Sequence, residues 1–138
     1  MFEPDTEKGG FVIYFPDLPK GVTQGESEAD ATDMAQDAIG LILGELMKRG
    51  EEIPQQRKMR GRRYRAIHLP AMQDAKVELY RQFRASGLRK VDLARRLGIP
   101  KTVVDRLFDL NHHSRLDQIE AAFAALGKRL AVQILDAA

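Results

Sequence analysis

The sequence contains no cysteine and no tryptophan, and its longest apolar run is only a few residues. Without cysteine there is no disulfide framework and no thiolate metal site, so an intracellular protein is the natural expectation. The short apolar runs exclude a membrane-spanning helix, and the acidic, glycine-containing start is unlike a signal peptide. We therefore expect a cytoplasmic protein with no metal site and no cofactor.

Positive charge is scarce in the first part of the chain and abundant in the rest. Residues 1–56 hold 4 Lys and Arg against 12 Asp and Glu, a net charge of −8, whereas residues 57–138 hold 18 against 8, a net charge of +10. The 138 residues, 43% of them hydrophobic, are enough for two small domains. The basic part suits the phosphates of nucleic acid, and the acidic part suits a basic protein partner.

The segment from Lys90 to Asp109 has the pattern of a DNA-binding helix-turn-helix. Two helices that cross through a short turn need a small residue at the crossing, a turn residue that can take positive φ, and apolar residues facing the shared core. Ala94, Gly98 and Val104 meet these needs in order, and Pro100 suits the first position of the second helix. An ordinary amphipathic helix pair would also have periodic leucines, but it would not require these three residues at these separations.

The outward residues of this segment are the predicted DNA contacts. We expect the second helix to enter the major groove, where its side chains reach base edges, and the start of the first helix to meet phosphates. The predicted contacts are Arg89, Lys90, Lys101, Thr102, Val103, Asp105 and Arg106. Val103 has two interpretations, because it can contact a thymine methyl group or pack within the domain.

Strand signals dominate the acidic part. Residues 11–15, Phe-Val-Ile-Tyr-Phe, are β-branched or aromatic and apolar on both faces, which predicts a central strand covered on both sides. A short strand is predicted at 22–25, and a further strand at 65–69, ended by Pro70, would close the sheet.

One long helix is predicted to pack on this sheet. It begins at Ser27 as the cap, with Asp30 as the capping partner, and runs to about Arg49, where Gly50 stops it. Residues 51–64 then lose apolar periodicity and become basic, which indicates a solvated loop. The first domain is therefore predicted to span residues 1–70.

The second domain, residues 71–138, is predicted to be helical with one final strand. A helix at 71–86 precedes the helix-turn-helix, and another follows a cap at Ser114. The last segment, residues 130–135, has the composition of a strand but no sheet of its own. We expect it to pair with the same strand of another subunit and so to build a homodimer. The fold class is α+β.

Four stretches together resemble the HicB antitoxins of bacterial type II toxin-antitoxin pairs, in the subgroup with a C-terminal helix-turn-helix. They are Gly-Gly-Phe-Val-Ile-Tyr-Phe-Pro-Asp-Leu-Pro at 9–19, Thr-Gln-Gly-Glu-Ser at 23–27, Asp-Leu-Ala-Arg-Arg-Leu-Gly at 92–98 and Ala-Leu-Gly-Lys-Arg-Leu at 125–130. The resemblance implies a first domain like a reduced RNase H fold that binds and blocks HicA, a small basic mRNA-cleaving toxin. It also implies repression of the protein's own operon through operator DNA.

Two further expectations follow from the resemblance. Family members usually begin with a full strand, whereas only three residues precede Pro4 here, so the chain is either truncated or has an unusually short first strand. The long helix can cover only one sheet face, which leaves the other face for the toxin or the second domain. The predicted toxin contacts are Tyr14, Asp17, Leu18 and Glu26.

Two other classes of function remain as alternatives. An enzyme would use clustered carboxylates to hold metal ions, and the candidates are Asp5, Asp17, Glu26, Asp30 and Asp33. These residues lie in turns and around a helix start, where acidic side chains are favoured without catalysis, so we expect no enzyme. The stronger alternative is a ligand-responsive repressor whose first domain senses a small molecule in a pocket between helix and sheet.

Overall fold

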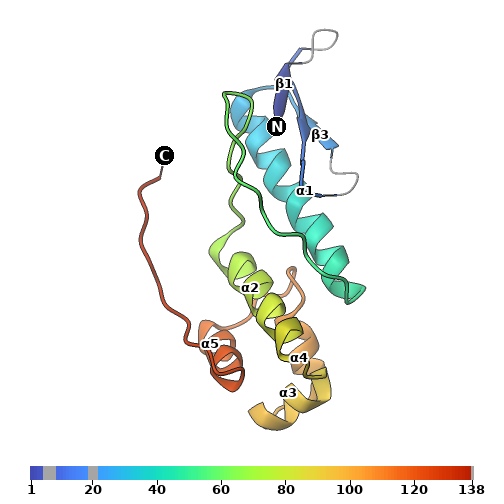
Figure 1. The fold of residues 1–138 in the computed structure, drawn as a ribbon, viewed down its shortest axis with the longest axis vertical. Helices are drawn as coiled ribbons and strands as arrows, with labels where there is room; N and C mark the ends of the chain where they lie inside the picture. Colours follow the sequence, from blue (N-terminus) through green and yellow to red (C-terminus); the bar gives the residue numbers. More distant parts are fainter. Residues whose placement is uncertain (5–8, 19–21, 138) are drawn as a thin grey trace. The chain divides into compact units, whose positions relative to one another are not determined.

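The computed structural model describes residues 1–4, 9–18 and 22–137, and the chain divides into two compact units, Met1–Asp74 and Ala75–Ala138. Within the described residues, three strands and a long helix come first and four shorter helices follow (Figure 1). The predicted α+β class is therefore confirmed. No helix in these ranges is long and apolar enough to cross a membrane.

The sheet of the first unit is antiparallel, with the strands in the order β1-β2-β3. Its strands are β1 (Phe2–Pro4), β2 (Phe11–Tyr14) and β3 (Val22–Gly25). The predicted central position of the strand at 11–15 is confirmed, because β2 pairs with β1 on one side and β3 on the other. The first strand is short. Residues 5–8 and 19–21, which flank the segment containing β2, lie outside the described residues.

Helix α1 (Glu28–Lys48) lies along the sheet (Figure 1). Its N-terminus is capped as predicted, because Ser27 Oγ accepts a hydrogen bond from the Asp30 backbone N at 3.1 Å. The Asp30 carboxylate in turn accepts from the Glu26 backbone N at 2.8 Å. The core between α1 and the sheet consists of Phe2, Ile13, Ala31 and Ala35, with Phe11, Phe15 and Ile67 packed around it.

The predicted strand at 65–69 is wrong, because residues 64–70 form no regular structure. The chain here runs beside the free edge of β1 and accepts one backbone hydrogen bond, from Phe2 N to Arg63 O at 2.7 Å. The carbonyl of His68 is occupied by the Gln36 side chain at 2.6 Å instead of a strand partner. The backbone of this segment is therefore paired in part by a side chain and not by a neighbouring strand. The loop predicted at 51–64 is confirmed as irregular.

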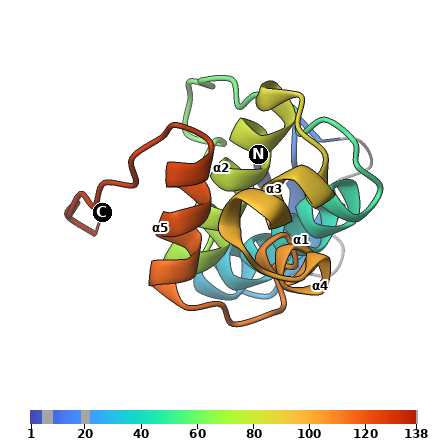
Figure 2. The same cartoon turned by 90° about the horizontal axis from the view of Figure 1, so that it is seen from below.

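Four helices make up the rest of the described chain. They are α2 (Ala71–Ser86), α3 (Lys90–Leu97), α4 (Lys101–Leu107) and α5 (Leu116–Ala125). Helix α3 lies next to both α4 and α5 (Figure 2). On α2, the rings of Tyr80 and Phe83 contact Phe108, with centroids 6.0 and 4.9 Å away. The α2 bounds match the prediction. The cap predicted at Ser114 is wrong by one residue, because Arg115 is the N-cap of α5 and Ser114 is buried.

The segment after α5 is extended and has no regular structure up to residue 137 (Figure 1). Three of its apolar side chains are strongly exposed, namely Val132 at 77%, Ile134 at 89% and Leu135 at 72%. A strand whose partner is another subunit has no ladder within a single chain. The strand predicted at 130–135 therefore stays a prediction.

Candidate functional site

The turn between α3 and α4 has the geometry predicted for a helix-turn-helix. Gly98 takes the left-handed conformation, with φ 65° and ψ 34°, and its N–H donates to the Ala94 carbonyl. Ile99 N donates to the same carbonyl at 3.1 Å. Both bonds go to the Ala94 carbonyl, in the last turn of α3. Pro100 is the N-cap of α4 and not its first helical residue, so α4 begins one residue later than predicted.

The inward faces of the two helices match the predicted core. Leu93 and Val104 are fully buried, and Ala94 and Leu107 are nearly so. Because α4 is short, burial of Val104 and Leu107 fixes which residues point outward. Lys101, Thr102 and Arg106 are exposed, and Val103 is half-buried, which fits either of its two predicted roles.

Three predicted contact residues meet at the outer side of the helix pair. Lys90 Nζ lies 3.0 Å from Asp105 Oδ1, and Lys101 Nζ lies 3.5 Å from Asp105 Oδ2. Burial alone would raise the pKa of Asp105, but the hydrogen bond from Lys90 and the charges of both lysines outweigh it and lower that pKa. Asp105 is thus held as a carboxylate between two cations, one on each helix.

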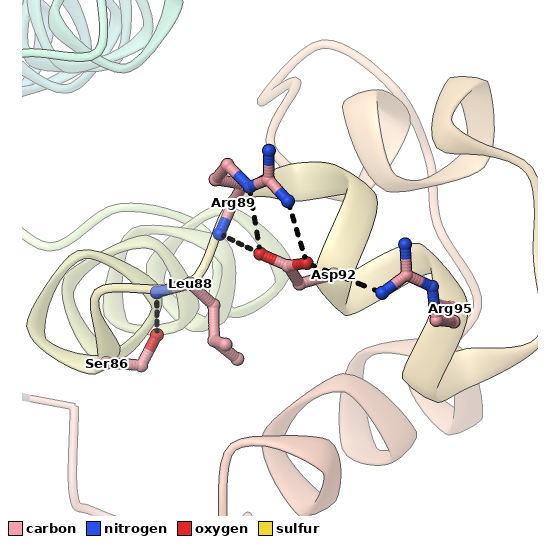
Figure 3. Close-up of polar contacts among 5 residues, drawn as sticks. All are labelled: Ser86, Leu88, Arg89, Asp92 and Arg95. Carbon is pink, nitrogen blue, oxygen red and sulfur yellow. Dashed lines mark hydrogen bonds and ion pairs between the residues drawn. The ribbon is translucent and has the colours of Figure 1, made fainter.

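Arg89, a predicted phosphate contact, is tied to the first turn of α3 (Figure 3). Asp92 accepts from the Arg89 backbone N at 3.0 Å and from its Nε at 3.2 Å, while Arg95 Nη1 lies 3.8 Å away. The side-chain and backbone hydrogen bonds from Arg89 hold the pKa of Asp92 below its usual value. Just before this turn, Leu88 N donates to Ser86 Oγ at 3.2 Å.

Arg106 differs from the other basic candidates. It is exposed on α4, and its side chain forms no ion pair among the described residues. Its guanidinium is therefore available for a ligand, whereas Arg89, Lys90 and Lys101 already hold carboxylates.

Sequence reasoning missed Lys76, which is fully buried on α2. Its Nζ donates to the carbonyls of Arg106 at 3.0 Å, Asp109 at 2.8 Å and His112 at 2.5 Å. The ammonium thus caps the C-terminal end of α4, where the helix dipole favours positive charge. A signal was present, because Lys76 lies at helical spacing among the inward residues Leu79, Tyr80 and Phe83.

The predicted toxin contacts do not form one cluster. Tyr14, Asp17 and Leu18 lie at the end of β2, whereas the register pairs Phe11 with Gly25 and so places Glu26 beyond the opposite end of the strand pair. Asp17 is already engaged by Arg57, whose backbone N donates at 3.1 Å and whose Nε also donates. These hydrogen bonds lower the pKa of Asp17.

The second face of the sheet is open within the described residues of this unit. Because side chains alternate along a strand and Ile13 faces α1, Val12 and Tyr14 face the other way. Val12 is half-buried and Tyr14 is 37% exposed. The predicted cover on both sides is therefore found only on the α1 side.

The carboxylates considered for catalysis are dispersed. In the described part of the chain, no group of three or more His, Asp or Glu residues could hold a metal ion. Asp17 pairs with Arg57 and Asp30 caps α1, while Asp5 lies outside the described residues.

Comparison with known proteins gives a consistent result. Residues 1–78 match the family described as HicB_like antitoxin of bacterial toxin-antitoxin system. The chain is 34% identical over 125 residues to Antitoxin HicB of Escherichia coli K12, covering 91% of this chain and 90% of that protein. It is 33% identical over 128 residues to Antitoxin HicB 1 of Photorhabdus laumondii, covering 93% and 81%. It is 32% identical over 132 residues to Antitoxin HicB of Pseudomonas fluorescens, covering 96% and 90%.

Proposed function

The chain belongs to the family of HicB-like antitoxins of bacterial toxin-antitoxin systems, and we propose that it neutralises a HicA-type mRNA-cleaving toxin and represses its own operon. Its first unit would bind the toxin and its helix-turn-helix would bind operator DNA. The family membership rests on similarity along most of the chain. The division of labour rests on the opposite charges of the two parts and on the helix pair.

DNA binding is supported chiefly by α4. Arg106 and Thr102 are exposed on the same short helix whose opposite side is buried through Val104 and Leu107. A helix of this kind fits the major groove, where an arginine can donate two hydrogen bonds to guanine. The Lys90 and Lys101 ammonium groups, joined through Asp105, would lie beside phosphates.

The test compares Arg106→Ala with Lys90→Ala on operator and random duplexes. Because Arg106 would touch bases, its loss should cost roughly 1 to 3 kcal/mol on the operator and little on random DNA. Loss of Lys90 should weaken both by similar factors and reduce the salt dependence. Titration by fluorescence anisotropy at several salt concentrations measures both effects. Equal losses on the two duplexes for both variants would contradict the assignment.

Toxin binding is supported by the open face of the sheet and the charge around it. Tyr14 and the half-buried Leu18 offer apolar surface at the end of β2, and the first 56 residues carry a net charge of −8. A small basic protein would bury the apolar side chains and be steered by the charge. Glu26 would serve as a separate, outlying contact, because it follows the far end of β3.

Stopped-flow association with a cognate toxin tests this proposal. Raising salt from roughly 50 to 500 mM should slow association while dissociation, governed by apolar contacts, changes much less. Tyr14→Ala should speed dissociation and restore RNA cleavage in the presence of the antitoxin. Gln118→Ala, which alters an exposed position of α5 in the second unit, serves as the control. Absence of any complex at low salt would contradict the antitoxin role.

The ligand-sensing repressor is distinguished by the same measurements, because it requires no protein partner. Close packing between β3 and α1 also leaves no space for a ligand beside Gly25. A Cβ on Gly25 would lie 2.4 Å from the Cα of Ala31, so the backbones leave no room there. Release from operator DNA by a small molecule, without toxin, would favour the sensor.

A further inference from the structure

Three arginines of the basic loop, residues 57–65, form ion pairs with carboxylates elsewhere in the first unit. Arg57 pairs with Asp17, Arg63 Nη1 lies 3.4 Å from Glu3, and Arg65 Nε lies 3.1 Å from Glu28. These three carboxylates come from the turn after β2, from β1 and from the first turn of α1. The loop is thus held at three separate places on the unit.

Backbone contacts add to this attachment. Arg63 O accepts from Phe2 N at 2.7 Å, and Tyr64 N donates to Gly61 O at 3.2 Å, which closes a turn. Gly61 has φ 121°, a conformation that L side chains rarely adopt, so the turn requires glycine. The Arg65 guanidinium lies 5.8 Å from the centre of the Phe2 ring. A loop held in this way presents its remaining side chains in fixed directions.

The remaining cations are Lys58, Arg60 and Arg62. All three are exposed, and none forms an ion pair among the described residues. Within the loop, the arginines at 57, 63 and 65 pair with carboxylates of the acidic unit, whereas the cations at 58, 60 and 62 do not. The loop therefore adds positive charge without an ion-pair partner among the described residues to a unit that is otherwise acidic.

We propose that Lys58, Arg60 and Arg62 form a second nucleic-acid contact, which binds the phosphate backbone of the duplex that the helix-turn-helix holds. This inference rests on the proposed DNA binding. Three cations on a short loop, none of them in an ion pair among the described residues, match the charge of a phosphate strand. The loop is joined covalently to the DNA-binding unit, so its local concentration at bound DNA is high even without strong intrinsic affinity.

The experiment compares two charge-matched double variants of the full chain. Lys58→Gln with Arg60→Gln removes one lysine and one arginine from the loop. Lys48→Gln with Arg49→Gln removes the same pair from the end of α1. The loop variant should reduce the slope of log affinity against log salt by about 1.8, since each phosphate contact contributes about 0.9. The control should leave the slope unchanged.

Two further arms separate this inference from its alternatives. Lys58→Arg with Arg60→Lys keeps both charges and should retain the wild-type slope. The effect of the loop variant should be equal on operator and random duplexes, unlike that of Arg106→Ala, because phosphates carry no sequence. A loop variant with the wild-type slope, or a control with the same loss, would overturn the inference. If the wild-type chain binds no DNA at all, the proposed DNA-binding function itself fails.

Discussion

Lys76 is the residue whose position contributes most to the order of the second unit. Its buried ammonium donates to three backbone carbonyls of α4 and the following turn, two of which, Arg106 O and Asp109 O, also accept from a backbone N–H. An apolar side chain of similar length would fill the space but would remove all three of these donors. Burial also lowers the pKa of Lys76, although the charge of Asp109 opposes this shift.

We therefore expect Lys76→Met to destabilise the protein by about 2 to 4 kcal/mol, because three hydrogen bonds from a charged donor to backbone carbonyls are lost. Urea unfolding followed by circular dichroism measures the loss. Lys48→Met, which removes an exposed lysine from α1, serves as the control and should change stability little. A Lys76→Met protein as stable as the control would show that water replaces the ammonium.

The two aspartates of the helix-turn-helix predict a pH dependence. Asp92 and Asp105 both have lowered pKa values in the fold, through Arg89 and Lys90 respectively. Their contribution is therefore present above the ordinary aspartate pKa of about 3.9 and is lost as pH falls through the lower folded values. The midpoint of thermal unfolding should fall below about pH 4. It should fall less in a chain carrying Asp92→Asn and Asp105→Asn, and identical profiles would refute this.

At the scale of elements, the turn between α3 and α4 depends on one conformation. Gly98 has φ 65° with open space around it, so a side chain there meets strain but no clash. Gly98→Ala should cost about 1 to 2 kcal/mol. Gly40→Ala is the matched control, because Gly40 lies inside α1 and a Cβ would meet Gln73 Oε1 at an ordinary 3.5 Å. That change should stabilise the protein by about 0.5 to 1 kcal/mol, since glycine is unfavourable within a helix.

Calorimetry of the two glycine variants measures whether each substitution raises or lowers the thermal midpoint. Opposite shifts of the thermal midpoint are the expected result. If Gly98→Ala left the thermal midpoint unchanged, the turn would be able to take another conformation. Operator binding by that variant would then show whether DNA binding depends on the crossing of α3 and α4.

At the scale of the whole molecule, the segment after α5 exposes three apolar side chains, Val132, Ile134 and Leu135. We propose that residues 130–135 pair between two copies, which would present two helix-turn-helix units to DNA half-sites about 34 Å apart. Exposed Val132 and Ile134 would be buried on one side of such a strand pair. The dimer would then explain why apolar side chains stand in water in the single chain.

A chain ended after Gly127 should therefore sediment as a monomer and bind operator DNA much more weakly than the full chain. Sedimentation velocity over a range of concentrations and a DNA titration measure the two effects. A full-length chain carrying Gln133→Ala, an exposed change within the same segment, should remain dimeric. Dimers that persist after truncation would place the interface elsewhere.

The sequence by itself determined the features that depend on neighbouring residues. The strand at β2, the cap at Ser27, the bounds of α2 and the left-handed Gly98 all follow from periodicity, capping and backbone preference within a few positions. The charge division and the family resemblance are likewise properties of the chain, and similarity to known antitoxins agrees with them.

Only the tertiary structure decided the features that join distant positions. Arg57 and Asp17 are 40 residues apart, and the three carbonyls around Lys76 are 30 to 36 residues away from it. The segment expected to be a strand at 65–69 is irregular, and there the Gln36 side chain, 32 residues earlier, donates to the His68 carbonyl. Local patterns state what a segment prefers, but the packing of other segments decides which hydrogen-bond partners and charges it meets.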